Sequence, residues 1–179
     1  MALFIKKLAQ ILFSQPMIKY TIRRAEEKDI AAMLGLVKEL AEFEKAPHEV
    51  ITSESQMLED GFGTNSIFKA FVAESDDDGE IIGIALYYTA YSTWKGKIYF
   101  LDDIVVKEKY RQLGIGRKLI NEMIKEAAEK NIPQIRWQVL DWNEPAIKFY
   151  ESLGVFIDKE WYTCKMSAPN MKDYISTIK

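Results

Sequence analysis

Hydrophobic and polar residues repeat along the chain with two different periods. Apolar runs rich in β-branched and aromatic residues predict strands at 18–23, 67–74, 81–91, 98–106, 135–140 and 161–166. A helical spacing of apolar residues predicts helices at 29–45, 53–63, 115–131 and 143–154. This order of elements predicts an α/β fold of the α+β sandwich type, with helices covering a single mixed sheet.

Local signals mark the ends of these elements. Asp29 is expected to cap the first helix, Ser53 and Gln56 form a capping box for the second, and Asn143 is expected to cap the last. The polar run at 75–79 predicts a turn between two strands of a hairpin.

Residues 1–16 differ from the rest of the chain because they contain no acidic residue and end at Pro16. Lys6 and Lys7 interrupt the apolar run that a signal peptide needs, and a membrane-surface helix has few charges to support it. We interpret this segment as a docking helix that precedes a single domain at 17–179.

The amino-acid composition excludes several classes of protein function. Apolar residues make up 48% of the 179 residues and charged residues 28%, as in a soluble globular domain. The net charge of −3 argues against non-specific nucleic-acid binding, and no apolar run reaches membrane-spanning length. The chain has a single histidine, His48, which argues against a usual metal site. It has a single cysteine, Cys164, which cannot form an internal disulfide. A reducing, cytoplasmic location is therefore expected.

A glycine-containing loop lies between the strand at 98–106 and the helix that follows. It reads Arg111-Gln112-Leu113-Gly114-Ile115-Gly116-Arg117. Glycine allows close approach and positive φ, and the N–H groups that begin a helix favour an anion, so the loop could hold a pyrophosphate. It lacks the Gly-Lys-Ser/Thr of a nucleoside-triphosphatase loop and the third glycine of a dinucleotide fingerprint. An ordinary loop with two glycines is the alternative.

Asp102 and Asp103 interrupt an otherwise apolar strand. Adjacent strand residues point to opposite faces, so we expect the two acids in different surroundings. A solvated strand or structural partners would explain them, and so would a carboxylate that takes the proton from an incoming ammonium. Backbone N–H groups freed where the strand splays from its neighbour after Asp103 could hold a carbonyl oxygen. In a reaction in which an amine attacks a thioester, Tyr150 could protonate the thiolate that leaves, although a tyrosine on an amphipathic helix is also ordinary core.

Arg-x-x-Gly-x-Gly between a strand and a helix resembles the acetyl-CoA loop of the GNAT superfamily of N-acetyltransferases. The segment 141–150, DWNEPAIKFY, is similar to the corresponding segment of the spermidine/spermine acetyltransferase family, and further similarity lies at 38–45, 58–63, 91–97 and 101–104. The resemblance covers residues 18–165. Ser-Thr-Trp-Lys-Gly at 92–96 and Val-Leu-Asp-Trp-Asn at 139–143 look most like the branch that acetylates thialysine. The family usually has glutamate where this chain has Asp102.

The resemblance implies a mostly antiparallel mixed sheet with acetyl-CoA at the splay between its two central strands. It assigns the following positions, each named by its residue here. The cofactor would contact Ile104, Val105, Val106, Arg111, Gln112, Leu113, Gly114, Ile115, Gly116, Arg117, Asn143, Ala146 and Tyr150. The amine would contact Phe43, Glu44, Trp94, Asp102, Asp103 and Trp161. Tyr150 would be the general acid and Asp102 the carboxylate that receives a proton through water.

The resemblance therefore implies an acetyl-CoA-dependent N-acetyltransferase that acts on a small primary amine, by direct attack in a ternary complex and without a metal. The acid-rich segment at 39–45 is either a solvated helix end or a rim that attracts the amine. The family forms homodimers whose subunits share active-site walls, so a homodimer is expected, with no nucleic-acid or membrane partner. The alternatives are acetylation of a protein lysine or N-terminus, and a non-catalytic acetyl-CoA-binding module.

Overall fold

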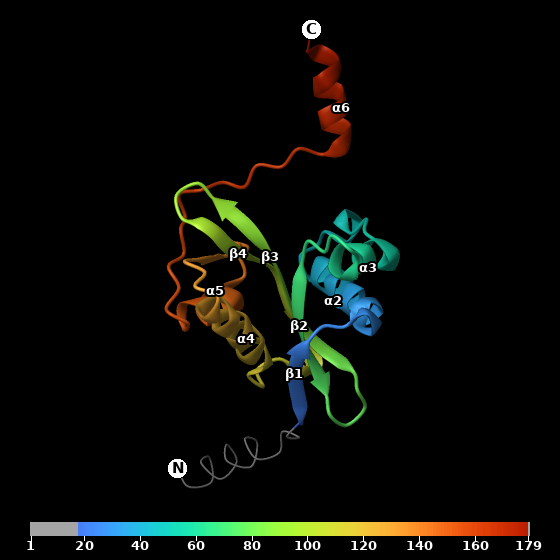
Figure 1. Ribbon diagram of the computed structural model, residues 1–179, viewed down its shortest axis with the longest axis vertical. Helices are drawn as coiled ribbons and strands as arrows, with labels where there is room; N and C mark the ends of the chain where they lie inside the picture. The colour runs from blue at the N-terminus through green and yellow to red at the C-terminus, as the bar shows by residue number, and fades with distance from the viewer. Residues whose placement is uncertain (1–17, 179) are drawn as a thin grey trace. The chain divides into compact units, whose positions relative to one another are not determined.

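The computed structural model describes residues 18–178, which form two compact units that divide between Gln138 and Val139 (Figure 1). The docking helix expected at 1–16 lies outside the described residues.

The first unit is built on a five-stranded sheet in the order β1-β2-β3-β4-β5. All neighbouring strands are antiparallel except β4 and β5, which are parallel, so the expected mixed, mostly antiparallel sheet is confirmed. The strands are β1 (Tyr20–Arg24), β2 (Lys69–Ser75), β3 (Ile81–Ser92), β4 (Gly96–Val106) and β5 (Ile135–Arg136).

Helices cover both faces of this sheet. Figure 1 shows α2 (Ile30–Phe43) and α3 (Glu54–Phe62) on one face and α4 (Ile115–Glu129) on the other. Three short 3-10 helices connect these elements, at Glu27–Asp29, Pro47–Glu49 and Glu108–Tyr110.

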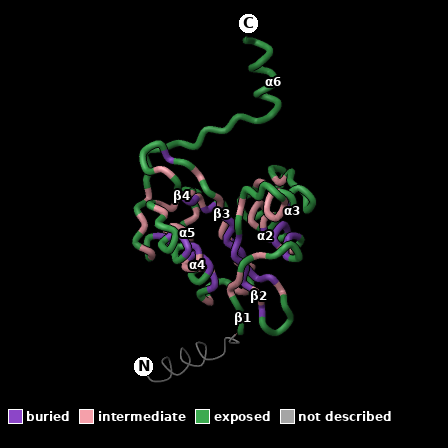
Figure 2. Tube along the Cα trace, viewed as in Figure 1, coloured by how far each residue is buried: buried purple, intermediate pink, exposed green. Residues whose placement is uncertain are grey.

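The apolar core follows the predicted periodicities, with buried residues on the sheet and on the inner sides of α2 and α4 (Figure 2). Met33 and Leu36 of α2 are fully buried with Ile84 of β3, whereas Leu119 and Met123 of α4 are fully buried on the other face. Burial of such side chains stabilises the fold by about 1.5–3 kcal/mol each relative to exposure.

The predicted helix starts are confirmed in part. Ser53 Oγ accepts a hydrogen bond from Gln56 N at 3.2 Å, as the capping box requires. Asp29 precedes α2, but its carboxylate does not cap that helix. The carboxylate instead accepts from Glu26 N and from both terminal nitrogens of Arg23, because a cation within 2.6–2.8 Å is the stronger partner.

The second unit contains α5 (Glu144–Glu151) and α6 (Ala168–Thr177). The strand predicted at 161–166 is wrong, because these residues are exposed and pair with no strand among those described. The strand predicted at 135–140 is also too long, since only Ile135 and Arg136 pair with β4. Alternating apolar residues form a strand only where a neighbouring edge can accept their backbone hydrogen bonds.

The sequence pattern did not predict α6. Its start nevertheless carries a capping signal, because Ser167 Oγ accepts from Asn170 N at 3.3 Å and a proline occupies the first turn. No helix within residues 18–178 is long and apolar enough to cross a lipid bilayer.

Candidate active site

β4 carries one more residue than β3 at Asp102. Leu86 of β3 lies opposite Asp103, and Tyr87 lies opposite Leu101, so Asp102 has no partner across the ladder. An extra residue of this kind is a β-bulge, which re-aims the side chains on either side of it.

The bulge places both acids on the face covered by α2. Asp103 lies opposite Leu86, which belongs to the core cluster beneath α2. The hydroxyl of Tyr99 donates to the carboxylate of Glu126, a residue of α4, at 2.9 Å, so Tyr99 faces α4. Because side chains alternate along a strand, Phe100 and Asp102 face the α2 side. The prediction that the two acids point to opposite faces is wrong, because the alternation that it assumed is interrupted by the bulge.

The two acids form a negative cluster with Glu44, which follows α2. The Asp103 carboxyl is partly buried, and this desolvation, together with repulsion from Asp102 and Glu44, raises its pKa to about 6. Desolvation also raises the pKa of Asp102, even though the residue as a whole is exposed. Neither aspartate forms an ion pair with another residue of 18–178. A bound ammonium group would supply the missing positive charge.

The edge of β4 beside this cluster is open. β5 pairs only with Tyr99 and Phe100, so β4 has no partner on that side from Leu101 onward within the described chain. Lys107 N donates to Ile82 O of β3 at 2.9 Å. Because bonded positions alternate along an antiparallel ladder, the N–H groups of Ile104 and Val106 face the open edge.

The other residue predicted on this stretch, Val105, is placed differently. Its side chain is buried in the core beneath α2, and the same alternation directs its N–H toward β3. At the open edge, the carbonyl oxygen of Val106 accepts from Arg111 Nε at 3.0 Å, which ties the glycine loop to the end of β4.

The glycine loop leads directly into α4. Gln112 and Gly114 adopt positive φ values of 65° and 78°, and α4 begins at Ile115 with Gly114 in the N-cap position. No side chain caps this helix start. The first N–H groups of a helix have no partner within it and lie at the positive end of its dipole, so those of Ile115 and Gly116 suit a phosphate. Leu113 is half-buried, and Arg117 is exposed on the first turn.

Arg111 also joins the loop to the end of α2. Its guanidinium lies over the ring of Phe43, 5.6 Å from the centroid. Phe43 immediately precedes Glu44, so the structure brings the predicted Phe43 and Glu44 of the amine site close to the loop and to Asp103.

Sequence reasoning missed Glu80, which holds the segment before the glycine loop. Its carboxylate accepts from Lys107 Nζ at 2.7 Å, from Lys109 Nζ at 3.0 Å and from the hydroxyl of Tyr110 at 3.0 Å. These hydrogen bonds, first of all that from Lys107, lower its pKa to about 2. The partners lie 27–30 residues away along the chain, so no local motif could have identified Glu80.

Trp94 is not brought to this cluster within one chain. It lies in the β3–β4 turn, where Ser92 Oγ accepts from Trp94 N at 3.3 Å, and its side chain is 81% exposed. Asp102 follows Gly96 by six positions in β4, which corresponds to about 20 Å along a strand.

The remaining predicted residues belong to the second unit. Asn143 caps α5 as predicted, because its side chain accepts from Ala146 N at 3.3 Å. Tyr150 is buried on α5 with its ring tilted against that of Phe149, whereas Trp161 is 75% exposed. Within residues 18–178, no three metal-ligating side chains are grouped closely enough to hold a metal ion.

Comparison with known proteins identifies the family. The model of the acetyltransferase (GNAT) family matches residues 33–155. The chain is 42% identical to a thialysine N-epsilon-acetyltransferase of Mus musculus over 139 residues, which covers 74% of this chain and 82% of the relative. It is 30% identical to spermidine/spermine N(1)-acetyltransferase-like protein 1 of Homo sapiens over 162 residues, 86% of this chain and 23% of the relative.

Solved structures agree on the fold. An aminoglycoside N-acetyltransferase, AAC(6')-Iy in complex with CoA, superposes with a TM-score of 0.66 at 21% identity and covers 86% of this chain and 99% of its own. An integron cassette protein of V. cholerae gives a TM-score of 0.71 at 21% identity, with 88% and 98% covered. The chain therefore belongs to the acetyltransferase (GNAT) family and is an acyltransferase.

Proposed function

We propose that this enzyme transfers an acetyl group from acetyl-CoA to a primary amine of a small molecule, which is a thialysine-like amino acid, a diamine or a polyamine. The observation that carries the proposal is the cluster of Asp102, Asp103 and Glu44 beside the open edge of β4 and the glycine loop. The relatives named for thialysine and spermidine/spermine acetylation support the same substrate class.

The residues present fit acetyl-CoA, which supplies an activated acetyl group as a thioester. The start of α4, with Gly114 at positive φ, would hold the pyrophosphate. The open-edge N–H groups of Ile104 and Val106 would donate to the acetyl and pantetheine carbonyls. By the family resemblance, Asn143 and Ala146 would lie beside the same molecule.

The acid cluster would handle the proton of the amine. An amine attacks only as its neutral form, so its ammonium must lose a proton inside the site. Asp102 would take this proton through water, and Asp103 and Glu44 would hold the cation before transfer. The raised pKa of Asp103 supports this role, because a bound cation relieves the repulsion that contributes to it.

Tyr150 would return a proton to the thiolate that leaves. A phenol carries its proton at neutral pH and can give it to a strong base formed nearby. Support comes from its place in the DWNEPAIKFY segment and from its burial, which would keep bulk water from competing.

The active form would be a homodimer located in the cytoplasm. Trp94 is exposed at a hairpin turn about 20 Å along the strand from Asp102, so a second copy is the natural source of an aromatic wall at each acid cluster. Cys164, a free and exposed thiol, suits a reducing compartment.

The direct test of the activity is release of free CoA thiol that depends on an added amine.

A further inference from the structure

A buried carboxylate on α4, that of Glu126, contacts two strands of the sheet at once. The hydroxyl of Tyr87, on β3, donates to its Oε2 at 2.6 Å, and the hydroxyl of Tyr99, on β4, donates to its Oε1 at 2.9 Å. Both tyrosines are buried, and their ring centroids lie 5.1 Å apart. Glu126 therefore ties β3 to β4 from the α4 side of the sheet.

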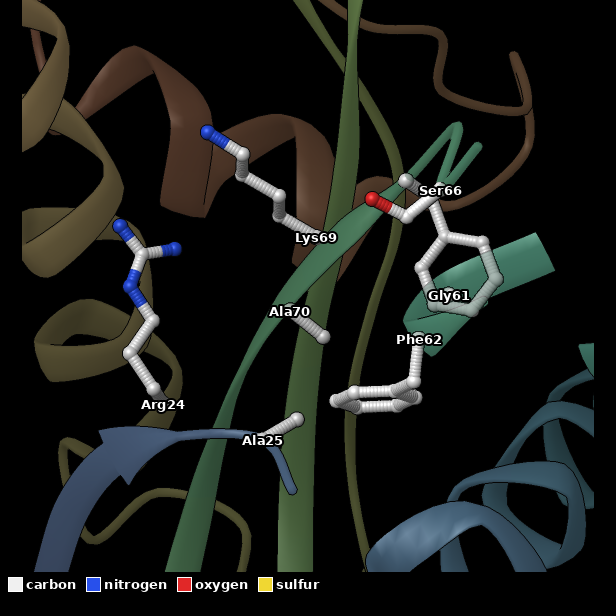
Figure 3. A pocket seen from close by; sticks show the side chains of 8 residues that line it. Arg24, Ala25, Gly61, Phe62, Ser66, Lys69 and Ala70 are labelled. Atoms are coloured by element: carbon white, nitrogen blue, oxygen red, sulfur yellow. The ribbon is translucent and has the colours of Figure 1, made fainter. Parts of the chain in front are cut away.

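Two cations complete the surroundings of this carboxylate. Arg24 forms an ion pair with Glu126, and Lys130 Nζ donates to Oε1 at 2.5 Å. Arg24 also lines a pocket with Phe62 and Ser66, but Figure 3 shows its guanidinium directed away from that pocket, to the side of β2 on which α4 lies. A carboxylate offers about four hydrogen-bond positions, which two cations and two hydroxyls fill. Removing the tyrosine hydroxyls would therefore leave it paired with both cations.

The two tyrosines lie directly beside the bulge in the ladder of β3 and β4. Tyr87 pairs with Leu101, Tyr99 precedes Leu101 by two residues, and Asp102, the extra residue, follows Leu101. If β4 slipped by one residue to remove the bulge, Tyr87 would lie opposite Asp102, and Tyr99 would turn to the α2 face. Its hydroxyl would then point away from α4. The two hydrogen bonds to Glu126 therefore require the register that is found on this side of the bulge.

Different contacts fix the register beyond the bulge. Leu86, Ile84 and Val105 belong to the core cluster beneath α2, where Ile84 pairs with Val105 and Leu86 pairs with Asp103. The strand pair is thus held from α4 on one side of the bulge and from α2 on the other. These two registers differ by one residue, so the extra residue must lie where they meet, at Asp102.

We propose that Tyr87, Tyr99 and Glu126 are positioning residues for acetyl transfer, which hold the bulge in place and thereby keep Asp102 and Asp103 together on the amine side of the sheet. This inference rests on the proposed function, which assigns both acids to the amine. The three residues act from the α4 side, whereas the acids face the α2 side. Without the two hydrogen bonds, β4 could adopt the register without a bulge, in which Asp102 turns to the α4 side, away from Asp103.

The test removes both hydroxyls and observes the acids directly. In the double variant Tyr87→Phe/Tyr99→Phe, Glu126 keeps both of its cations, so we expect the full chain to fold. Ile30→Ala controls for a general loss of stability, because Ile30 is buried at the start of α2 and its truncation leaves a cavity far from the bulge. The measurement is the pH titration of the Asp103 carboxyl by carbon-13 NMR without ligand, together with kcat/KM for the amine.

The pKa of Asp103 should fall from about 6 in the wild type to about 5 or below in the double variant, because separation from Asp102 removes part of the repulsion. The value of kcat/KM should fall about tenfold in the double variant, and Ile30→Ala should match the wild type in both measurements. An unchanged pKa in the double variant overturns the positioning role, even if that variant melts at a lower temperature. If the pKa falls but the wild type shows no amine-dependent turnover, the hold on the bulge is supported and only the proposed function fails.

Discussion

Asp102 and Asp103 are adjacent in β4 yet face the same side of the sheet, because Asp102 is the extra residue of the bulge opposite Leu86 and Tyr87. A regular strand would have separated them. The bulge therefore concentrates negative charge at the point where β4 parts from β5, and it makes the two carboxylates interact. Asp102 is exposed whereas Asp103 is partly buried, so we expect substitutions of the two residues to have different effects.

Asp102→Asn should lower the rate of acetyl transfer by about 100-fold, as expected for loss of a general base. The loss should be greatest at low pH, where the amine holds its proton most firmly. The measurement is kcat/KM as a function of pH, with Asp77→Asn in the exposed β2–β3 turn as the control. An unchanged pH profile in Asp102→Asn would remove the proton-transfer role.

Asp103→Asn should stabilise the protein at neutral pH. The folded-state pKa of about 6 exceeds the usual value of 3.8, so the folded state binds more protons between these values and the free energy of unfolding falls as pH rises through them. Removing the charge should recover at most about 3 kcal/mol at pH 7.5 and nothing at pH 3. Urea unfolding at both pH values measures this, and an equal effect of the substitution at both would contradict it.

Tyr150→Phe should reduce kcat by about 100-fold while acetyl-CoA affinity is retained, because only a proton donor is removed. Tyr162→Phe, at a position 94% exposed, is the control. Equal kcat values for Tyr150→Phe and wild type across the pH range would rule out the general-acid role.

Glu80→Gln should weaken acetyl-CoA binding about tenfold with kcat nearly unchanged, because the segment that leads to the glycine loop loses a charged anchor for two lysines and a tyrosine. Titration of CoA into the variant measures the affinity. Glu108 is an exposed acid on the same segment, and Glu108→Gln should bind CoA like the wild type. If Glu80→Gln binds CoA as tightly as Glu108→Gln does, the anchor is not needed.

Mixed dimers should reveal whether Trp94 serves the second copy. Trp94→Ala and Asp102→Asn should each be impaired alone, whereas a dimer with one copy of each retains one complete site. Differently tagged chains, co-expressed and purified through both tags, should recover about half of the wild-type activity per dimer. A monomer by light scattering, or mixed dimers no better than the parents, would contradict the shared site.

Local patterns predicted most of the first unit, since strands, helices and the Ser53 cap depend on residues close in sequence. The bulge at Asp102 could not be predicted in this way, because it exists only relative to the register of β3. The same limit applies to Glu80 and Glu126, whose partners lie on distant segments.

In the second unit, a local sequence pattern predicted a strand that does not form. The aromatic run at 161–166 satisfies a strand pattern, but no strand edge within the described chain pairs with it. In contrast, Ser167 as the N-cap and Pro169 in the first turn mark the start of α6.

The central claim is acetyl transfer to a small amine, and amine-dependent release of CoA thiol tests it most directly. Acetyl-CoA would be offered with thialysine, lysine, spermidine, putrescine or a lysine-containing peptide, each separately. We predict rapid release with thialysine and little with the peptide. Tight binding of acetyl-CoA with no release for any amine would contradict the account and favour a binding module, and release with the peptide alone would favour a protein acetyltransferase.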